Sequence, residues 1–475
     1  MQRRRIALGL IAGVISEAAN KLIPLATLHL AATRLGVKPF GVSQFSQWLT
    51  DLGVYFVAFG FAAWAPLAWR SADQNGAKDQ MDRARVFSSV TLMRLLHALV
   101  ACLVLSFVVQ DGSTWSEYRW ILLPTLFIVV TSAFDCLWAI TYLRAIPLFS
   151  GISIAAKVIS LIAIVSMVQG PGDALKYTVI LQSANAALSM ASFVYVWRVV
   201  GWAWPSIAQL AVAFRGSLPF AVSAFLLVAI ERLDMALVES ALGAAGAGAY
   251  GGPMKIAISM MPIAGMVTTV FFAEMLNVFE NESMLRHLQA VIRVAVVLLA
   301  PVAVGMWFVY QDVVPLILGA EFAAYAKVLP ILSSCIVAQM FMIIFGSQVL
   351  ALRGRVALYN WALLAGVVVV AGSASILGAR FGLEGFALAS AARRWVAALL
   401  AGVFGLMIID DGRRRIILET MRSFIPAAVM TGVLLLLPQQ SWIASIVIGG
   451  TVYGAIAGIL FRGTIASALS ARAGS

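Results

Sequence analysis

The sequence predicts an all-α membrane protein that crosses the bilayer many times. Of its 475 residues, 62% are hydrophobic and only 11% are charged, too few to cover the surface of a water-soluble protein of this length. Apolar stretches of membrane-spanning length recur from end to end, and no polar block is large enough to form a soluble domain. The pattern also argues against a membrane β-barrel, which would show short segments of alternating hydrophobicity.

Each apolar stretch is expected to form one transmembrane helix of roughly 20 residues, the length that a bilayer core of ~30 Å requires. An even number of spans with arginine-rich ends places both termini in the cytoplasm. About fourteen spans are expected, at residues 6–31, 40–68, 86–109, 120–144, 150–169, 176–199, 217–241, 250–275, 287–310, 328–351, 356–378, 383–409, 423–437 and 441–461.

The net charge of +12 is distributed as the positive-inside rule requires. Basic residues gather in alternate short loops, so the surplus sets topology and favours contact with anionic lipid rather than with nucleic acid. The clusters lie before the first span, after the second and near the end of the chain: Arg3, Arg4, Arg5, Arg70, Lys78, Arg83, Arg85, Arg413, Arg414, Arg415 and Arg422.

Motifs for metal binding and for nucleotide chemistry are absent from the sequence. The three cysteines are single residues within apolar runs, and neither a CxxC nor an HExxH pattern occurs. No GxxxxGK[ST] loop is present, so no ATP site of that type is expected. The loops are too short to hold a catalytic module, and no metal or cofactor is expected.

The segment 200–216 divides the chain near its middle and reads as an interfacial helix on the cytoplasmic surface. A faint internal repeat supports two related halves. "LGVKPFG" and "LGAAGAGAYG" each place two glycines five residues apart in an outer turn, Gly36 with Gly41 and Gly243 with Gly248. Duplicated halves are common in secondary transporters, although glycine-rich turns also occur commonly between unrelated helices.

Ionisable residues deep within the spans are the main functional candidates. Each costs roughly 2.5–3.5 kcal/mol on insertion scales, so such residues usually face a polar cavity or a partner. Six spans carry polar stripes, more than helix packing requires. The candidates for substrate binding are Lys21, Arg232, Arg393, Arg394, Lys157, Lys255, Asp135 and Asn185, and those for ion coupling or charge balance are Glu17, Asp51, Glu231 and Asp234.

Structural explanations compete for part of this set. Glu17 and Lys21 stand four residues apart on one helix and can neutralise each other, and Arg232 has Glu231 and Asp234 beside it. The lysines nearer to helix ends can extend to the interface. The adjacent pair Arg393 and Arg394 has no acid in its own span, so one of the two is expected to face a hydrated cavity or an acid elsewhere.

Three stretches resemble one transporter family. "LGVKPFGVSQFSQWLTDLGVYF" is similar to the outer turn and second helix of polysaccharide flippases, and "FDCLWAITYLRAIPLFSGISIAAKVISLIAI" to their fourth and fifth helices. "VVPLILGAEFAAYAKVLPILSS", "QVLALRGRVALYN" and "FGLEGFALASAARR" resemble their ninth to twelfth helices. The resemblance is to Wzx-type O-antigen or oligosaccharide flippases, in the superfamily shared with MATE drug exporters and lipid II flippases.

The resemblance implies two six-helix lobes with pseudo-symmetry around a central cavity, followed by two extra helices. The corresponding parts are residues 1–199, an interfacial linker at 200–216, residues 217–410, and residues 411–475 with a cytoplasmic tail. The implied function is translocation of an undecaprenyl-diphosphate-linked oligosaccharide, an O-antigen or exopolysaccharide repeat unit, from the inner to the outer leaflet of the bacterial inner membrane. A polysaccharide polymerase or chain-length protein would be a partner.

By position, Lys21, Asp51, Asp135, Lys157 and Arg232 match places where the family carries polar residues, whereas Arg393 and Arg394 match no family motif. The cations would bind the diphosphate, and the acids would balance them or carry a coupling ion. Coupling to protons, to sodium or to the membrane potential stays open.

Other functions remain open at this point. A MATE-like drug or cation antiporter and a lipid II flippase would have the same fold, and an acidic, aromatic cavity would favour the antiporter. A membrane glycosyltransferase, polymerase or ligase is disfavoured, because such enzymes need a sizeable catalytic loop that this chain does not show. A purely structural scaffold would have no reason to retain so many charges within its spans.

Overall fold

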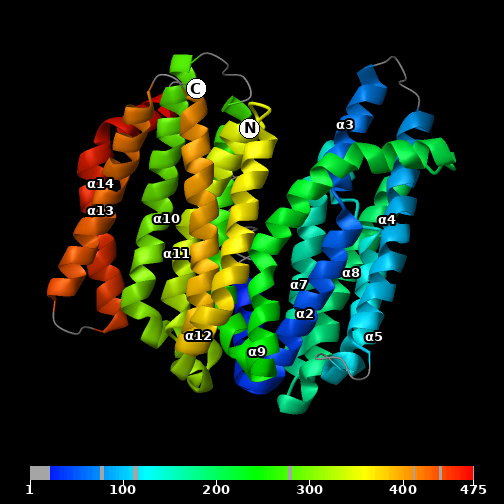
Figure 1. Cartoon of the computed structure of the whole chain (residues 1–475), viewed down its shortest axis with the longest axis horizontal. Helices are drawn as coiled ribbons and strands as arrows, with labels where there is room; N and C mark the ends of the chain where they lie inside the picture. The colour runs from blue at the N-terminus through cyan, green and yellow to red at the C-terminus, as the bar shows by residue number, and fades with distance from the viewer. Residues whose placement is uncertain are drawn as a thin grey trace. The chain divides into compact units, whose positions relative to one another are not determined.

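A computed structural model describes residues 22–74, 80–110, 116–275, 281–409, 412–437 and 441–473 of the chain. The regular structure of these residues is helical throughout, and they contain no strand. Eleven of the described helices are long and apolar enough to cross a membrane (Figure 1). The predicted all-α, multi-span fold class is therefore confirmed, and the chain is a multi-pass membrane protein.

The chain forms two compact units, Met1–Gly251 and Gly252–Ser475. The first unit opens with the helix Leu22–Leu35. A core of aromatic side chains that includes Phe61, Trp69 and Phe87 packs its helices together. These helices are α2 (Val37–Ala58), α3 (Phe61–Gln74), α4 (Gln80–Val108), η1 (Ser116–Ile121), α5 (Leu122–Ser132), α6 (Leu137–Tyr142), α7 (Ile146–Met167), η2 (Pro171–Asp173), α8 (Ala174–Val200) and the first part of α9 (Ile207–Met275).

The second unit contains the rest of α9 and all later helices. Its core is mainly aliphatic and joins α10 to the helices that follow it. One segment, η4, is a π-helix, a form that is rare over this length. The elements are α10 (Asn281–Leu318), η3 (Ala320–Tyr325), α11 (Val328–Phe341), η4 (Met342–Ala351), α12 (Val356–Ile408), α13 (Arg413–Leu436) and α14 (Trp442–Ala473).

Two long helices each combine two predicted spans. α9 is interrupted at Gly243, with φ 63°, and α12 at Gly382, with φ 56°. Glycine is the residue that adopts positive φ without a Cβ clash, so it provides the turn between spans that follow one another closely. The breaks fall where the sequence placed the turns between spans seven and eight and between spans eleven and twelve.

The repeated glycine pairs have matching roles in the first unit. Gly36 and Gly243, the first glycine of each pair, have φ of 75° and 63° and form the turns. Gly41 and Gly248, the second of each pair, bring two backbones together: a Cβ on Gly41 would lie 1.8 Å from the carbonyl oxygen of Ala244. The glycine pairs therefore mark equivalent turns and also a contact that only glycine permits.

The segment predicted as a separate linker is continuous with the span that follows it. Residues 201–206 are not helical, and α9 runs without a break from Ile207 to Gly243. Leu210 packs against the core of the first unit, while Ile207 is 86% exposed. One side of this helical segment is therefore packed and the other is open. The lobe boundaries implied by the resemblance stay a prediction.

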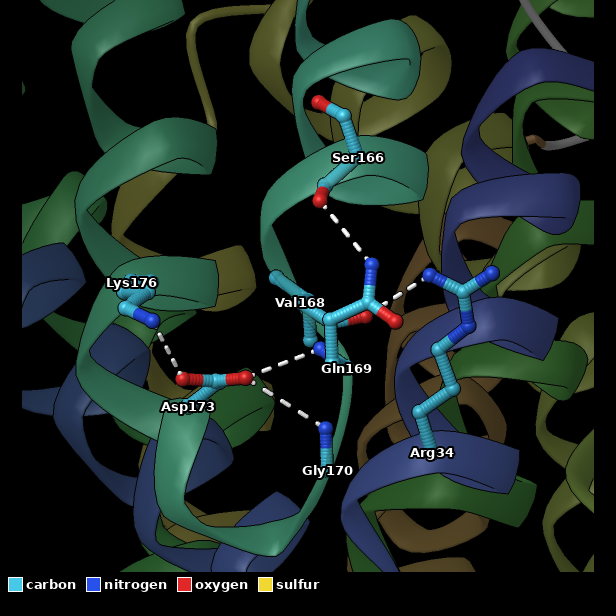
Figure 2. A network of polar contacts seen from close by, with 7 residues as sticks. All are labelled: Arg34, Ser166, Val168, Gln169, Gly170, Asp173 and Lys176. Atoms are coloured by element: carbon cyan, nitrogen blue, oxygen red, sulfur yellow. Dashed lines mark hydrogen bonds and ion pairs between the residues drawn. The ribbon is translucent and has the colours of Figure 1, made fainter.

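A polar network at the turn between α7 and α8 holds the end of the first helix (Figure 2). Arg34, at the end of Leu22–Leu35, donates from Nη1 to the backbone carbonyls of Val165 and Val168 at 2.7 Å each. Asp173 accepts from the backbone N–H of Gln169 at 2.8 Å and pairs with Lys176 at 2.7 Å. The arginine thus satisfies carbonyls that the end of α7 leaves without helical partners.

Candidate functional site

An ion pair between Asp51 and Arg232 joins two helices that are far apart along the chain. Nη1 of Arg232 on α9 lies 3.0 Å from Oδ2 of Asp51 on α2. The ring of Tyr55, one turn further along α2, has its centroid 5.8 Å from Cζ of the same guanidinium. Nε1–H of Trp48 donates to the backbone carbonyl of Arg232 at 2.7 Å. Side chains of α2 therefore hold both the backbone and the charged group of Arg232.

This pair is accessible from outside the unit. The side chain of Asp51 is 40% exposed and that of Arg232 is 29% exposed. Nε of Arg232 is buried and donates to no acceptor in the part of the chain that the structure describes. Since a guanidinium can donate two parallel hydrogen bonds to a phosphate or carboxylate, the arrangement can bind an anion.

Two further carboxylates on α9 are enclosed by protein. Asp234 is 1% exposed and accepts a hydrogen bond from the hydroxyl of Tyr250 at 2.7 Å. Glu239 is 4% exposed and accepts one from the hydroxyl of Tyr118 at 3.0 Å. The ion pair of Arg232 is made with Asp51 and not with Asp234, because residues two apart on a helix point in different directions.

The fourth span is interrupted between α5 and α6. Residues Ala133 to Cys136 leave the helix, and several backbone groups lose their helical partners. The hydroxyl of Ser192 accepts from the backbone N–H of Cys136 at 3.0 Å and lies 3.4 Å from the carbonyl oxygen of Phe134. Side chains thus replace the lost backbone bonds, which an interruption within a membrane span requires.

Asp135 stands at this interruption with a buried arginine next to it. Its Oδ1 accepts from the backbone N–H of Leu137 at 3.1 Å, and its backbone carbonyl accepts a hydrogen bond from Arg94 on α4. Arg94 is 3% exposed. The predicted site residue Asp135 is therefore part of a local framework within the first unit, with its side chain half-buried.

The adjacent arginines Arg393 and Arg394 lie inside the second unit. They are 0% and 2% exposed, and both donate to the hydroxyl of Ser390, at 3.1 and 2.5 Å. Nη1 of Arg394 also lies 3.9 Å from Sγ of Cys335 on α11. One serine therefore joins the two guanidiniums, which are enclosed by protein instead of lying on an exposed wall of the unit.

The remaining predicted residues that the structure describes lie on α7, α8 and α9. Asn185 is exposed on α8, Lys157 is half-buried on α7, and Lys255 is half-buried on the part of α9 that belongs to the second unit. Glu231 is half-buried beside Arg232. Glu17 and Lys21 lie outside the described residues. Among the predicted residues, the structure thus joins Asp51 to Arg232, and Arg393 to Arg394.

Three charged residues with partners in the structure were not among the sequence candidates. Arg94 lies well inside the third predicted span, so the rule that singled out the other mid-span charges applies to it equally. Arg293 on α10 pairs with Glu419 on α13, with 2.5 Å between Nε and Oε1. Glu419 precedes its predicted span by a few residues, so a search confined to the spans does not include it.

No group of three or more histidine, cysteine, aspartate or glutamate side chains that could hold a metal ion occurs among the described residues.

No family model matches the sequence, and no curated protein matches it. The lipid II flippase MurJ, in an inward closed conformation, matches in structure with a TM-score of 0.71 over 97% of this chain and 100% of that one, at 16% identity.

Two MATE transporters are also similar in structure. An inward-facing multidrug resistance MATE transporter of the MOP superfamily has a TM-score of 0.57 over 83% of this chain and 95% of that one, at 17% identity. The eukaryotic MATE transporter AtDTX14 has a TM-score of 0.55 over 89% and 99%, at 15% identity. The chain has the fold of these flippases and transporters. At such identities the likeness concerns the fold alone.

Proposed function

We propose that this protein is a flippase for a lipid-linked oligosaccharide, an O-antigen or exopolysaccharide repeat unit carried on undecaprenyl diphosphate. The observation that carries the proposal is the accessible guanidinium of Arg232, held beside Asp51 in a chain with the fold of a lipid II flippase. A diphosphate that leaves water needs donors to replace it, and charge-assisted hydrogen bonds are the strong ones. The oligosaccharide is the part of the proposal that rests on the resemblance of the sequence.

The other predicted residues receive roles within the same proposal. The cations and polar side chains would contact the cargo, and the acids would balance the cations while no cargo is bound. The cargo-contacting group is Lys21, Arg232, Arg393, Arg394, Lys157, Lys255, Asp135 and Asn185, and the balancing group is Glu17, Asp51, Glu231 and Asp234. Arg393 and Arg394 are enclosed by protein in this structure and would meet the cargo in another conformation. The protein would act in the inner membrane with both termini in the cytoplasm, near a polysaccharide polymerase or chain-length protein.

Gene deletion followed by complementation tests this function. In the deletion strain the lipid-linked intermediate should accumulate, and its sugar composition identifies the cargo. Arg232→Ala should fail to restore transport at normal protein level, and Arg232→Lys should restore it in part, since lysine keeps the charge but loses the two-pronged geometry. Lys176→Ala, which removes the exposed partner of Asp173, is the matched control and should complement fully. Full complementation by Arg232→Ala would refute the proposal.

A MATE-like cation antiporter is the second candidate, and the buried carboxylates favour it. Asp234 and Glu239 are enclosed and each accepts from a tyrosine hydroxyl, as a proton or cation carrier could. Reconstituted protein that exchanges an organic cation for protons, with no lipid-linked intermediate accumulating in the deletion strain, would decide for this function.

A further inference from the structure

We propose that Asp51 is a built-in competitor for the anionic group of the cargo, which occupies Arg232 in the empty protein and helps to release the cargo at the end of transport. This inference rests on the proposed function, since it concerns the same cation. Removing the carboxylate of Asp51 should strengthen anion binding if Asp51 competes with the anion. Removing it should weaken anion binding if Asp51 only holds Arg232 in place.

Two donor atoms of Arg232 differ in their partners. Asp51 takes Nη1 of Arg232 at 3.0 Å, while Nε of the same guanidinium has no acceptor among the described residues. Because Nε is buried, an arriving phosphate oxygen reaches it only after the guanidinium turns away from Asp51, so the two anions compete for one cation. Because a carboxylate and a phosphate are both anions, they repel each other, and full two-pronged binding of the phosphate favours departure of the acid.

The anchoring of Arg232 allows this exchange without a change of fold. Its backbone carbonyl accepts from Nε1–H of Trp48, and its guanidinium rests near the ring of Tyr55. Neither contact involves the carboxylate of Asp51, so both can persist while the acid moves. Tyr55 also keeps the partly exposed cation close to an aromatic face, an attractive contact that does not depend on the acid.

The exposure of Asp51 and Arg232 indicates how strongly the two side chains hold each other. Both side chains are partly exposed, at 40% and 29%, and an ion pair that is open to water is only weakly stabilising. An acid held this weakly can be displaced by a doubly charged group, and it can return when the cargo meets water on the other side. A fully buried pair would hold the arginine too firmly for such an exchange.

Binding of inorganic pyrophosphate to the purified full-length protein in detergent tests the inference. We expect Asp51→Asn to bind pyrophosphate up to about fivefold more tightly than the wild type, which corresponds to ~1 kcal/mol released from the ion pair. The gain should vanish in the double variant Asp51→Asn with Arg232→Ala, because the competed cation is then absent. Asp173→Asn, which removes the acid of the exposed pair with Lys176, should leave the affinity unchanged.

Transport provides a second readout. In proteoliposomes, Asp51→Asn should lower KM for the cargo and lower kcat with it, the pattern expected when a bound state is stabilised and release slows. Asp51→Ser, which also removes the charge but is smaller, should behave in the same way, so a folding defect specific to the asparagine would be recognised.

The outcomes separate this inference from the proposed function. If the wild type binds pyrophosphate through Arg232 and the Asp51 variants bind it no more tightly, Asp51 is not a competitor and the proposed function stands. If Arg232→Ala binds pyrophosphate as well as the wild type, the anion site itself is wrong, and the proposed function fails with it.

Discussion

Two arginine–carboxylate pairs in this protein look alike in chemistry and differ in surroundings. In the first unit, Asp51 and Arg232 are 40% and 29% exposed and lie 3.0 Å apart. In the second unit, Glu419 and Arg293 are 10% and 22% exposed and lie 2.5 Å apart. Each arginine also contacts an aromatic ring, Tyr55 for Arg232 and Phe461 for Arg293.

The difference in exposure distinguishes an ion pair that a ligand could open from an ion pair that holds helices together. The pair of Arg293 and Glu419 joins α10 to α13, and the ring of Phe461 on α14 lies 5.3 Å from Cζ of Arg293, so three helices meet at one charge. Arg422 on α13 contacts the same ring and donates to the carbonyl of Leu460 at 3.1 Å. Such an enclosed pair stabilises packing, whereas an exposed pair costs little to open and is available to a ligand.

Removing the ion pair of Arg293 and Glu419 should lower the stability of the protein more than any other change proposed here. Glu419→Ala leaves the half-buried Arg293 without this acid, which should destabilise the second unit by up to about 3 kcal/mol. Thermal unfolding of the purified protein measures this effect, and Glu419→Gln, which keeps a hydrogen-bond acceptor, should lose less. If Glu419→Ala unfolds at the temperature of the wild type, the pair does not brace the helices and the contrast between the two pairs fails.

Arg94 extends the comparison to an arginine that binds backbone instead of an acid. Arg94→Ala removes the donor to the carbonyl of Asp135 at the interruption of the fourth span, and hydrogen bonds to charged groups contribute about 1.5–3 kcal/mol. Hydrogen exchange in detergent should show faster exchange near residues 133–145, with partial protection restored by Arg94→Lys. If hydrogen exchange is unchanged in Arg94→Ala, the interruption of the fourth span does not depend on Arg94 for its stability.

A substitution at Gly41 tests the contribution of a close backbone contact to stability, without any change of charge. Gly41→Ala would place a Cβ 1.8 Å from the carbonyl oxygen of Ala244, so α2 and α9 must separate, at a cost typical of overpacking of about 1–3 kcal/mol. Gly151→Ala on α7 is the matched control, because a Cβ there meets nothing within 4 Å. Equal melting temperatures for the two variants would show that the close contact is dispensable.

The smallest effect is expected at the most exposed pair. Lys327 and Glu384 lie 3.8 Å apart with 64% and 46% of their side chains exposed. Because solvent screens both charges, Lys327→Ala should leave the melting temperature of the protein within experimental error. A measurable loss would show that exposure alone does not rank these pairs, and would weaken the reading of Asp51 and Arg232 as an easily opened pair.

Much of the fold could be predicted from the sequence because its causes are local. A long apolar run must form a helix in a bilayer, since its backbone groups have no other partners there. Glycines such as Gly243 and Gly382 mark turns because few other residues adopt positive φ. The interruption of the fourth span was not predicted, since it depends on Ser192 and Arg94, which come from other helices.

Composition and the recurrence of apolar runs are enough to predict the class of protein, the approximate spans and the charged residues within them. The tertiary structure alone decided which charge meets which. Glu231 and Asp234 stand beside Arg232 along the chain, yet the arginine pairs with Asp51 on a distant helix. The physical reason is that a helix points neighbouring side chains in different directions, so the partner of a charge is set by how helices pack.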